Sequence, residues 1–458
     1  MLLWRFIPSP PNYPIGQSFN KTPTNAEWAR FRKYARRIRA FRVNPSLFPI
    51  PPEVLSVLED STLGAPLLLG LRTFVCIEAT VAFIPFISLF LSRVTTMIAV
   101  NFVKFLPTPP TSAITSMIAT PSTRCPDLRR ITLHHLPRSP VVVATVSEML
   151  LACNRNTLQS FDVDSPLTEA ARKVLSKLPN LRVLRLALEG PTLLPPMVLP
   201  NLVGMYIIYP YGHEWLRSFY GAVLNNLTYA TFYTTTPYVG DFLEVFEGVG
   251  RATSISATLS TFQFYSFHPW SPTYSSLLAF KQLTNLTIAS PCRIHCSSTV
   301  DDDIVVNLAR AMPKLKVLQL GLEPCQTLTG VTVKGLVELA CHCISLSTLR
   351  VHLRVDSLVQ AAVGEVVPSP PNDEHAASRE ECALMTLEVG NTPIPEGTAL
   401  IVALALLHIF PRISDIKHTN TQWGSVARTI ILSRRLSRRL SSRIGALAHS
   451  SRSTADMP

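Results

Sequence analysis

The sequence has few charged residues and lacks an apolar run long enough to cross a bilayer. Charged residues make up 16% of the 458 residues and hydrophobic residues 47%, which argues against general disorder. The most apolar window, residues 79–92, has 14 uncharged residues and is interrupted by Pro85, whereas a transmembrane helix needs about 20 residues. A second apolar run, residues 398–410, is shorter still. The composition therefore favours a large buried core, and a membrane partner is not expected.

Glycine and closely spaced cysteine are also scarce. There are 18 Gly against 38 Pro, which predicts many short elements separated by proline-marked turns. The nine cysteines lie scattered between Cys76 and Cys382, without the dense spacing of a disulfide scaffold. The first residues break into prolines before the apolar core of a signal peptide could form. These features predict an intracellular protein, cytoplasmic or nuclear.

The positive charge is concentrated at the two ends. Residues 1–44 carry nine Lys or Arg and one acid, and residues 412–458 carry nine and two. These two ends account for more than the formal net charge of +12. The body between them gives no indication of a nucleic-acid partner.

Motifs that carry chemistry are missing. The sequence has no nucleophile elbow, phosphate-binding loop, HExxH or dinucleotide fingerprint. The best metal-ligand candidates, Cys292-x-x-His295-Cys296 and Cys341-His342-Cys343, lack the paired CxxC spacing of a zinc site. We therefore expect no catalytic residues, no metal and no cofactor, and a protein that is not an enzyme.

One phrase recurs along the chain. An apolar residue is followed by two variable residues, a second apolar residue, one variable residue and a third apolar residue, as in Leu181-x-x-Leu184-x-Leu186. The thirteen copies, of which those at Leu71, Val94, Leu227, Leu259 and Ile413 are weaker, have twelve spacings of 21 to 38 residues. The other copies begin at Leu128, Leu158, Leu181, Leu202, Leu283, Leu315, Leu346 and Leu384.

The segments between the copies have helical periodicity. Residues 168–178, 301–312, 141–153, 240–249 and 331–341 place apolar residues three or four apart. A strand and a helix in each repeat predict an α/β fold, a leucine-rich-repeat solenoid resembling the ribonuclease-inhibitor horseshoe, with roughly 12–13 irregular repeats. The alternative is a doubly wound α/β domain, which the recurrent phrase and the lack of a Gly-rich loop disfavour.

The two ends differ from the repeats. Residues 24–45 are predicted to form an amphipathic capping helix, which begins with a capping box at Thr24 and Glu27. Residues 1–23 are expected to be a disordered or truncated segment, and residues 433–458 a basic, partly disordered tail. Between them, residues 46–432 are predicted to form the repeat array, with a polar loop at residues 363–381.

Strand geometry predicts which residues a partner would contact. The leucines of each phrase face the core, so the residue between the last two faces the opposite, concave side. Mixed polarity with Tyr and Arg suits protein recognition. This rule selects one line of residues: Thr132, Arg185, Tyr206, Thr287, Gln319, Arg350 and Glu388.

The chain resembles the leucine-rich-repeat F-box-like proteins of mushroom-forming (basidiomycete) fungi. The resemblance covers residues 24–440 and is carried by residues 25–31 (NAEWARF), 34–39 (YARRIR), 71–74 (LRTF), 393–396 (PIPE) and 410–412 (FPR). It implies a substrate-recognition subunit of a cullin-type ubiquitin ligase, whose F-box docks on the ligase adaptor. Only 23 residues precede Thr24, and they show no two-helix apolar pattern, so we expect the F-box to be missing or truncated.

Two functions follow from these features. The first is a non-catalytic protein-interaction scaffold with a protein substrate or partner, and a ligase adaptor as a second partner if an F-box exists. The alternative is a membrane-associated protein that uses residues 79–92 and the basic tail.

Overall fold

A computed structural model describes most of the chain. It covers residues 24–47, 49–62, 65–103, 111–188, 197–209, 222–234, 248, 255–266, 274–289, 300–321, 330–363, 382–390 and 392–453. The predictions for residues 1–23, 240–247, 249 and 364–381 lie outside these ranges, as do Cys292, His295 and Cys296. The chain divides into two compact units, residues 1–227 and 228–458, which are described separately.

The first unit alternates strands with helices or helical turns. Its strands are β1 (Ala40–Val43), β2 (Thr73–Ala79), β3 (Met97–Phe102), β4 (Arg130–His134), β5 (Ser160–Val163), β6 (Val183–Ala187) and β7 (Gly204–Tyr209). Its helical segments are α1 (Asn25–Ala35), α2 (Pro52–Thr62), η2 (Ile84–Phe90), α3 (Thr111–Arg124), α4 (Pro140–Ala152) and α5 (Glu169–Leu175).

The second unit repeats this alternation. Its strands are β8 (Tyr229–Thr234), β9 (Thr261–Ser266), β10 (Asn285–Ala289), β11 (Val317–Leu320), β12 (Thr348–Arg350), β13 (Thr386–Gly390) and β14 (Asp415–His418). Its helical segments are α7 (Ile255–Thr258), η4 (Tyr274–Ala279), α8 (Asp302–Ala311), α9 (Val333–His342), α10 (Val355–Val363), α12 (Ala399–Ile409) and α13 (Thr421–Ser453).

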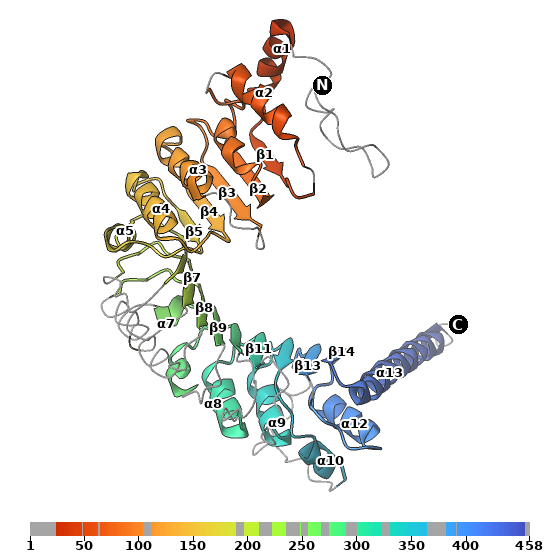
Figure 1. Ribbon diagram of the computed structural model, residues 1–458. Helices are drawn as coiled ribbons and strands as arrows, with labels where there is room; N and C mark the ends of the chain where they lie inside the picture. The colour runs from red at the N-terminus through yellow and green to blue at the C-terminus, as the bar shows by residue number, and fades with distance from the viewer. Residues whose placement is uncertain are drawn as a thin grey trace. The chain divides into compact units, whose positions relative to one another are not determined.

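Within each unit the strands form a parallel sheet in chain order. In the first unit each of β1 to β6 pairs with the next strand, and in the second unit each of β8 to β13 does so. The connecting helices lie on one side of the strands and leave the other side open (Figure 1). This solenoid-like α/β arrangement confirms the coarse fold prediction. It contradicts the doubly wound alternative, in which the strand order reverses within the sheet.

A single hydrogen-bond pattern opens nearly every strand. The backbone N–H groups of Gln159 and Ser160 both donate to the carbonyl oxygen of Arg129, at 2.8 and 3.0 Å. In the next repeat, Arg182 and Val183 donate in the same way to Gln159. Equivalent pairs open β2 to β7 in the first unit and β9 to β14 in the second. Each repeat therefore enters the sheet in a register fixed by the preceding one.

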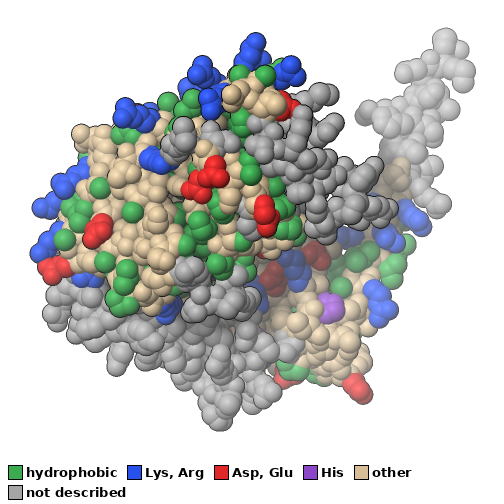
Figure 2. Space-filling view, turned by 45° about the horizontal axis from the view of Figure 1, so that its top comes forward, with side chains coloured by type: hydrophobic (Ala, Val, Ile, Leu, Met, Phe, Trp, Pro, Cys, Tyr) green, Lys and Arg blue, Asp and Glu red, His purple; other side chains and the backbone are tan. Residues whose placement is uncertain are grey.

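The predicted leucine phrases form the buried face of the sheet. Leu181, Leu184 and Leu186 are each at most 1% exposed, and parallel pairing aligns their counterparts in neighbouring strands into continuous apolar rows. Burying one such side chain stabilises the fold by about 1.5–3 kcal/mol. Other apolar side chains, drawn in green, are scattered over the surface that Figure 2 shows.

One copy of the phrase was assigned one residue too early. The register of β2 with β3 places Thr95, not Val94, opposite Leu71, and Val94 is 45% exposed. Thr95 is fully buried; its hydroxyl donates to the carbonyl oxygen of Leu71 at 2.9 Å and accepts from the Ser92 N–H at 3.0 Å. A polar residue thus occupies a leucine position because Ser92 in the turn before β3 and Leu71 in the preceding repeat supply its hydrogen-bond partners.

The N-terminal helix is shorter than predicted. The capping box of Thr24 and Glu27 is present, but α1 ends at Ala35 and the chain then forms β1, so a single helix over residues 24–45 was wrong. The carbonyl oxygen of Arg36 lies so close to Gly70 that a side chain at Gly70 would collide with it. This close approach, which only glycine permits, packs the helix end against the next repeat.

The other predicted helices are confirmed where the structure describes them. They correspond to α4, α5, α8 and α9. Thr168 and Asp301 cap α5 and α8 by accepting backbone N–H groups. Of the tail predicted over residues 433–458, residues 433–453 are helical as part of α13, and residues 454–458 lie outside the described ranges.

Thr95 provides a test of this register. Replacing Thr95 by Val keeps the shape but leaves the buried N–H of Ser92 without its acceptor. We expect the free energy of unfolding to fall by about 1–3 kcal/mol, measured by urea denaturation. Thr95→Ser, which keeps the hydroxyl, should lose less, and an unchanged stability of Thr95→Val would contradict the assignment.

The described cysteines test the core in another way. Burial raises the pKa of the thiols of Cys76 and Cys343 to about 12 and that of Cys153 to about 11. Because only the thiolate reacts readily, iodoacetamide at pH 8.5 should leave these residues unmodified in the folded protein and modify them after unfolding. Peptide mass spectrometry reads this out, with the half-buried Cys341 as internal comparison; rapid native labelling of Cys76 would show that the core is open.

Candidate functional site

The residues predicted to face a partner lie in two rows, one in each unit. In the first unit, Thr132, Arg185 and Tyr206 share one register position with Asp162 between them. In the second unit, Thr287, Gln319, Arg350 and Glu388 follow one another on adjacent strands. The structure thus brings three predicted residues together in the first-unit row and four in the second-unit row.

Most of these side chains are partly exposed, and one is not. The side chains of Arg185, Arg350 and Glu388 are 33%, 27% and 16% exposed. Thr287 is only 3% exposed, and its hydroxyl donates to Oε1 of Gln319 at 3.4 Å. Thr287 therefore holds the side chain of Gln319 by a hydrogen bond and offers little surface to a partner.

Among the row residues that were missed in the sequence, three carry charged or amide side chains. Asp162 pairs with Thr132 and Arg185, Gln263 pairs with Thr287, and Lys417 pairs with Glu388. Each lies between the second and third marked positions of a phrase, namely those that begin at Leu158, Leu259 and Ile413. Applying the strand rule to every copy, including the weak ones, would have selected them.

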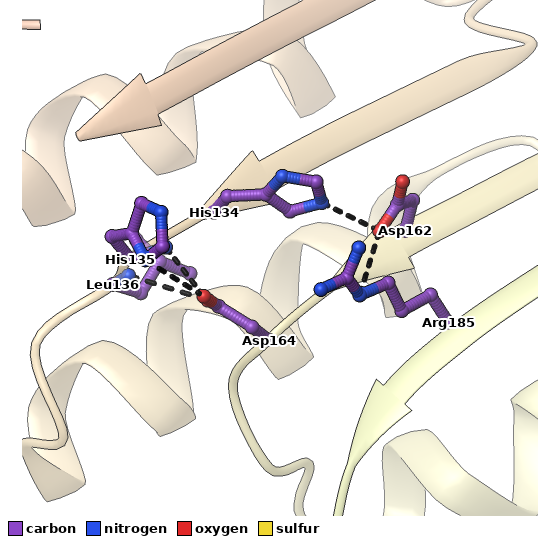
Figure 3. A network of polar contacts seen from close by, with 6 residues as sticks. All are labelled: His134, His135, Leu136, Asp162, Asp164 and Arg185. Carbon is purple, nitrogen blue, oxygen red and sulfur yellow. Dashed lines mark hydrogen bonds and ion pairs between the residues drawn. The ribbon is translucent and has the colours of Figure 1, made fainter. Parts of the chain in front are cut away.

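A polar network crosses three strands of the first unit (Figure 3). Nε2 of His134 on β4 lies 2.7 Å from Oδ1 of Asp162 on β5, and Nε of Arg185 on β6 lies 3.7 Å from the same oxygen. His134 and Asp162 are 22% and 23% exposed. Because one carboxylate holds a side chain on each side, the three groups have fixed positions on the open face of the sheet.

The turn after β4 is fixed by a second carboxylate. Oδ2 of Asp164 accepts from the backbone N–H of His135 at 2.5 Å, and Oδ1 accepts from that of Leu136 at 3.3 Å. His135 has a φ of 60°, a left-handed conformation that costs a non-glycine residue about 1–2 kcal/mol. The two hydrogen bonds offset this strain and hold the turn beside the network.

The second-unit row ends in a ladder of charges. Nη1 of Arg350 and Nζ of Lys417 lie 3.6 and 2.9 Å from the carboxylate of Glu388. The hydrogen bond from Lys417 to Glu388, with the attraction of that carboxylate, raises the pKa of the Lys417 ammonium. A central acid between two bases gives this end of the row a net positive charge.

An aromatic pair stands at the other end of the second unit. Tyr233 and Tyr265 are register partners on β8 and β9, two residues beyond Thr231 and Gln263. Their rings stack at 4.7 Å with an angle of 9°. Burial, followed by the proximity of Tyr233, raises the pKa of the Tyr265 hydroxyl. The second unit therefore presents aromatic, amide and charged groups along one face.

Among the described residues, no three His, Cys, Asp or Glu side chains are grouped as metal ligands. Cys343 is fully buried, and its Sγ points to the carbonyl oxygens of Ala309 and Met312, at 3.7 and 3.6 Å. It packs as a core residue between α8 and α9.

The apolar window at residues 79–92 also belongs to the core. Phe83, Ile84 and Ile87 are at most 2% exposed, and Phe90 stacks on Phe74 of β2 at 5.7 Å. Within the described ranges, no helix is both long and apolar enough to serve as a transmembrane span. These apolar side chains are therefore used in folding and are not presented to a bilayer.

Asp164 gives a test of the turn. Replacing Asp164 by Ala removes both acceptors and should lower the free energy of unfolding by about 1–3 kcal/mol. Adding His135→Gly, which relieves the left-handed strain, should recover roughly 1 kcal/mol. Thermal denaturation of the single and double variants measures both effects; a stabilising effect of Asp164→Ala would contradict the role of the carboxylate.

No protein-family model matches the sequence, and no curated protein matches it significantly.

Proposed function

We propose that this chain is a non-catalytic protein-interaction scaffold, built as a leucine-rich-repeat solenoid, whose partner binds the open face of the sheet. The repeated strand-entry hydrogen bond and the buried leucine rows support the solenoid, since stacked repeats share one core. The observation that carries the binding role is the pair of register rows. They place Arg, Tyr, Gln, Asp and Glu side chains on a rigid surface.

The chemistry of the rows suits a folded protein partner. Arg and Tyr are the residue types most enriched where binding energy concentrates, and each row includes at least one arginine. Asp162 and Glu388 hold Arg185 and Arg350 in place, so binding loses less side-chain entropy than it would with free arginines. A partner surface with carboxylates and backbone carbonyls would complement these groups.

The more specific role rests on the resemblance to F-box-like proteins. In that role the repeats present a protein substrate to a cullin-type ligase in an intracellular compartment, cytoplasmic or nuclear. Recovery of the ligase adaptor with the full-length chain would support ligase docking. Recovery of a substrate without the adaptor would leave a scaffold that acts outside the ligase.

The binding face is tested by comparing two matched triple variants. The first, Arg350→Ala, Glu388→Ala and Lys417→Ala, removes the charge ladder of the second-unit row. The second, Arg310→Ala, Lys334→Ala and Glu338→Ala, removes the same charges from α8 and α9 on the helix side. In affinity purification with quantitative mass spectrometry, a specific partner should drop about tenfold or more with the first variant only, because interface anchors contribute about 1–2 kcal/mol each.

Circular dichroism should show that both variants remain folded. A partner retained equally by the row variant and the wild type, or lost equally with both triple variants, would refute binding at this row.

A further inference from the structure

Among the side chains that the structure describes, those in the first part of helix α13 fix it to the rest of the second unit. Trp423, Val426 and Ile430 are at most 1% exposed, and Nε1 of Trp423 donates to the carbonyl oxygen of Thr392 at 2.8 Å. Nη2 of Arg434 donates to the carbonyl oxygen of Pro411 at 2.8 Å. Beyond this anchor the helix runs away from α12 and β14 (Figure 1).

The outer part of α13 exposes leucines on one side. Leu432, Leu436 and Leu440 are 57%, 59% and 60% exposed, and they follow one another at intervals of four residues. With 3.6 residues per turn, each interval rotates the position by about 40° around the helix. The leucines therefore spread over a broad apolar sector instead of forming a straight seam.

Helix α13 also has no negatively charged side chain. Its sequence contains seven arginines and no acidic residue. Arg435 and Arg439 lie four residues apart beside the leucine sector, and Arg434 and Arg438 repeat that spacing farther round the helix. Like charges at this spacing repel one another, so an anionic surface would stabilise the helix.

We propose that the outer part of α13 lies on an anionic phospholipid surface, with its leucines in the interface and its arginines among the headgroups. An interfacial helix combines an apolar side with Lys or Arg on its polar side. The long aliphatic part of an arginine side chain lets its guanidinium group extend to the phosphates. A partner helix would instead require an apolar seam with a mean spacing near 3.5 residues and acids to pair with the bases. The spacing of four and the all-arginine flank favour the lipid surface.

This role is separate from the open face of the sheet. The buried residues 79–92 take no part in it, and the row residues lie on strands, not on α13. The leucine and arginine variants of α13 described below should leave partner recovery in the affinity experiment unchanged. Failure of one proposal is thus distinguishable from failure of the other.

The test is co-sedimentation of the full chain with vesicles. Vesicles of phosphatidylcholine alone should bind little protein, and vesicles that include phosphatidylserine should bind it strongly. Raising the salt to about 0.5 M should release most of the protein, because exposed charges are then largely screened.

Variants assign the binding to α13. The triple variant Arg435→Gln, Arg438→Gln and Arg439→Gln should weaken binding on the order of 100-fold, since each basic residue at the surface contributes about one factor of five. The double variant Leu436→Ser and Leu440→Ser should weaken it about tenfold or more. Neither variant touches the anchor at Trp423, Val426 and Ile430, so the fold is retained.

Two controls separate the helix from general surface properties. Basic side chains also gather elsewhere on the molecule (Figure 2), and Arg30→Gln, Lys33→Gln and Arg36→Gln on and just after α1 remove the same charge. Val141→Ser and Leu151→Ser remove exposed apolar groups from α4. Both controls should bind vesicles like the wild type.

Four outcomes would overturn the proposal. They are equal binding to neutral and anionic vesicles, no binding to either, equal loss in the α1 control and the α13 variant, and retention on polyglutamate or RNA without vesicle binding. The last outcome would assign the arginines to an acidic protein or a nucleic acid.

Discussion

The parallel strands of both units depend on one recurring constraint, the pair of backbone N–H groups that donate to a single carbonyl oxygen at the start of nearly every strand. This bond sets the register of every repeat on the preceding one. A slip by one residue would turn the leucines to the open face and the polar row to the core. Connections as different as η2 and α4 are therefore tolerated, because a connection needs only to let the next strand pair in the correct register. The irregular spacing of the phrases is a consequence: the strand is fixed and the connection varies.

The strand positions could be predicted from the sequence because the leucine pattern is a direct result of this constraint. The pattern failed where local chemistry replaced it. Thr95 fills a leucine position because Ser92 and Leu71 supply its hydrogen-bond partners. A search for apolar residues cannot detect such a position. At residues 40–43 an aromatic and arginine-rich segment has helical periodicity, yet pairing with β2 makes it a strand. Tertiary pairing overrides local preference in such short segments.

The candidate rows were partly predictable for the same reason. Strand alternation determines which residues face away from the leucines, so Arg185, Gln319 and Glu388 could be selected by position alone. Exposure could not be selected in this way, because it depends on the size of the neighbours: Thr287 is covered although its register is that of Gln319. The network around Asp162 could not be seen in the sequence either, because its ion pairs join residues that are 28 and 23 positions apart and meet only through strand pairing.

Charge separates the two surfaces on which the proposals rest. In the rows, Asp162 and Glu388 each lie beside basic side chains, so part of the positive charge is compensated and shape and hydrogen bonds contribute more to recognition. In α13 no acid is present in the helix to cancel the arginines, so its field extends outward to about a Debye length, roughly 8 Å at physiological salt. A partly compensated surface discriminates between partners mainly at contact, whereas an uncompensated one also attracts an oppositely charged surface before contact. The two proposed roles therefore rest on different elements, the strands of the rows and helix α13, and on different balances of charge.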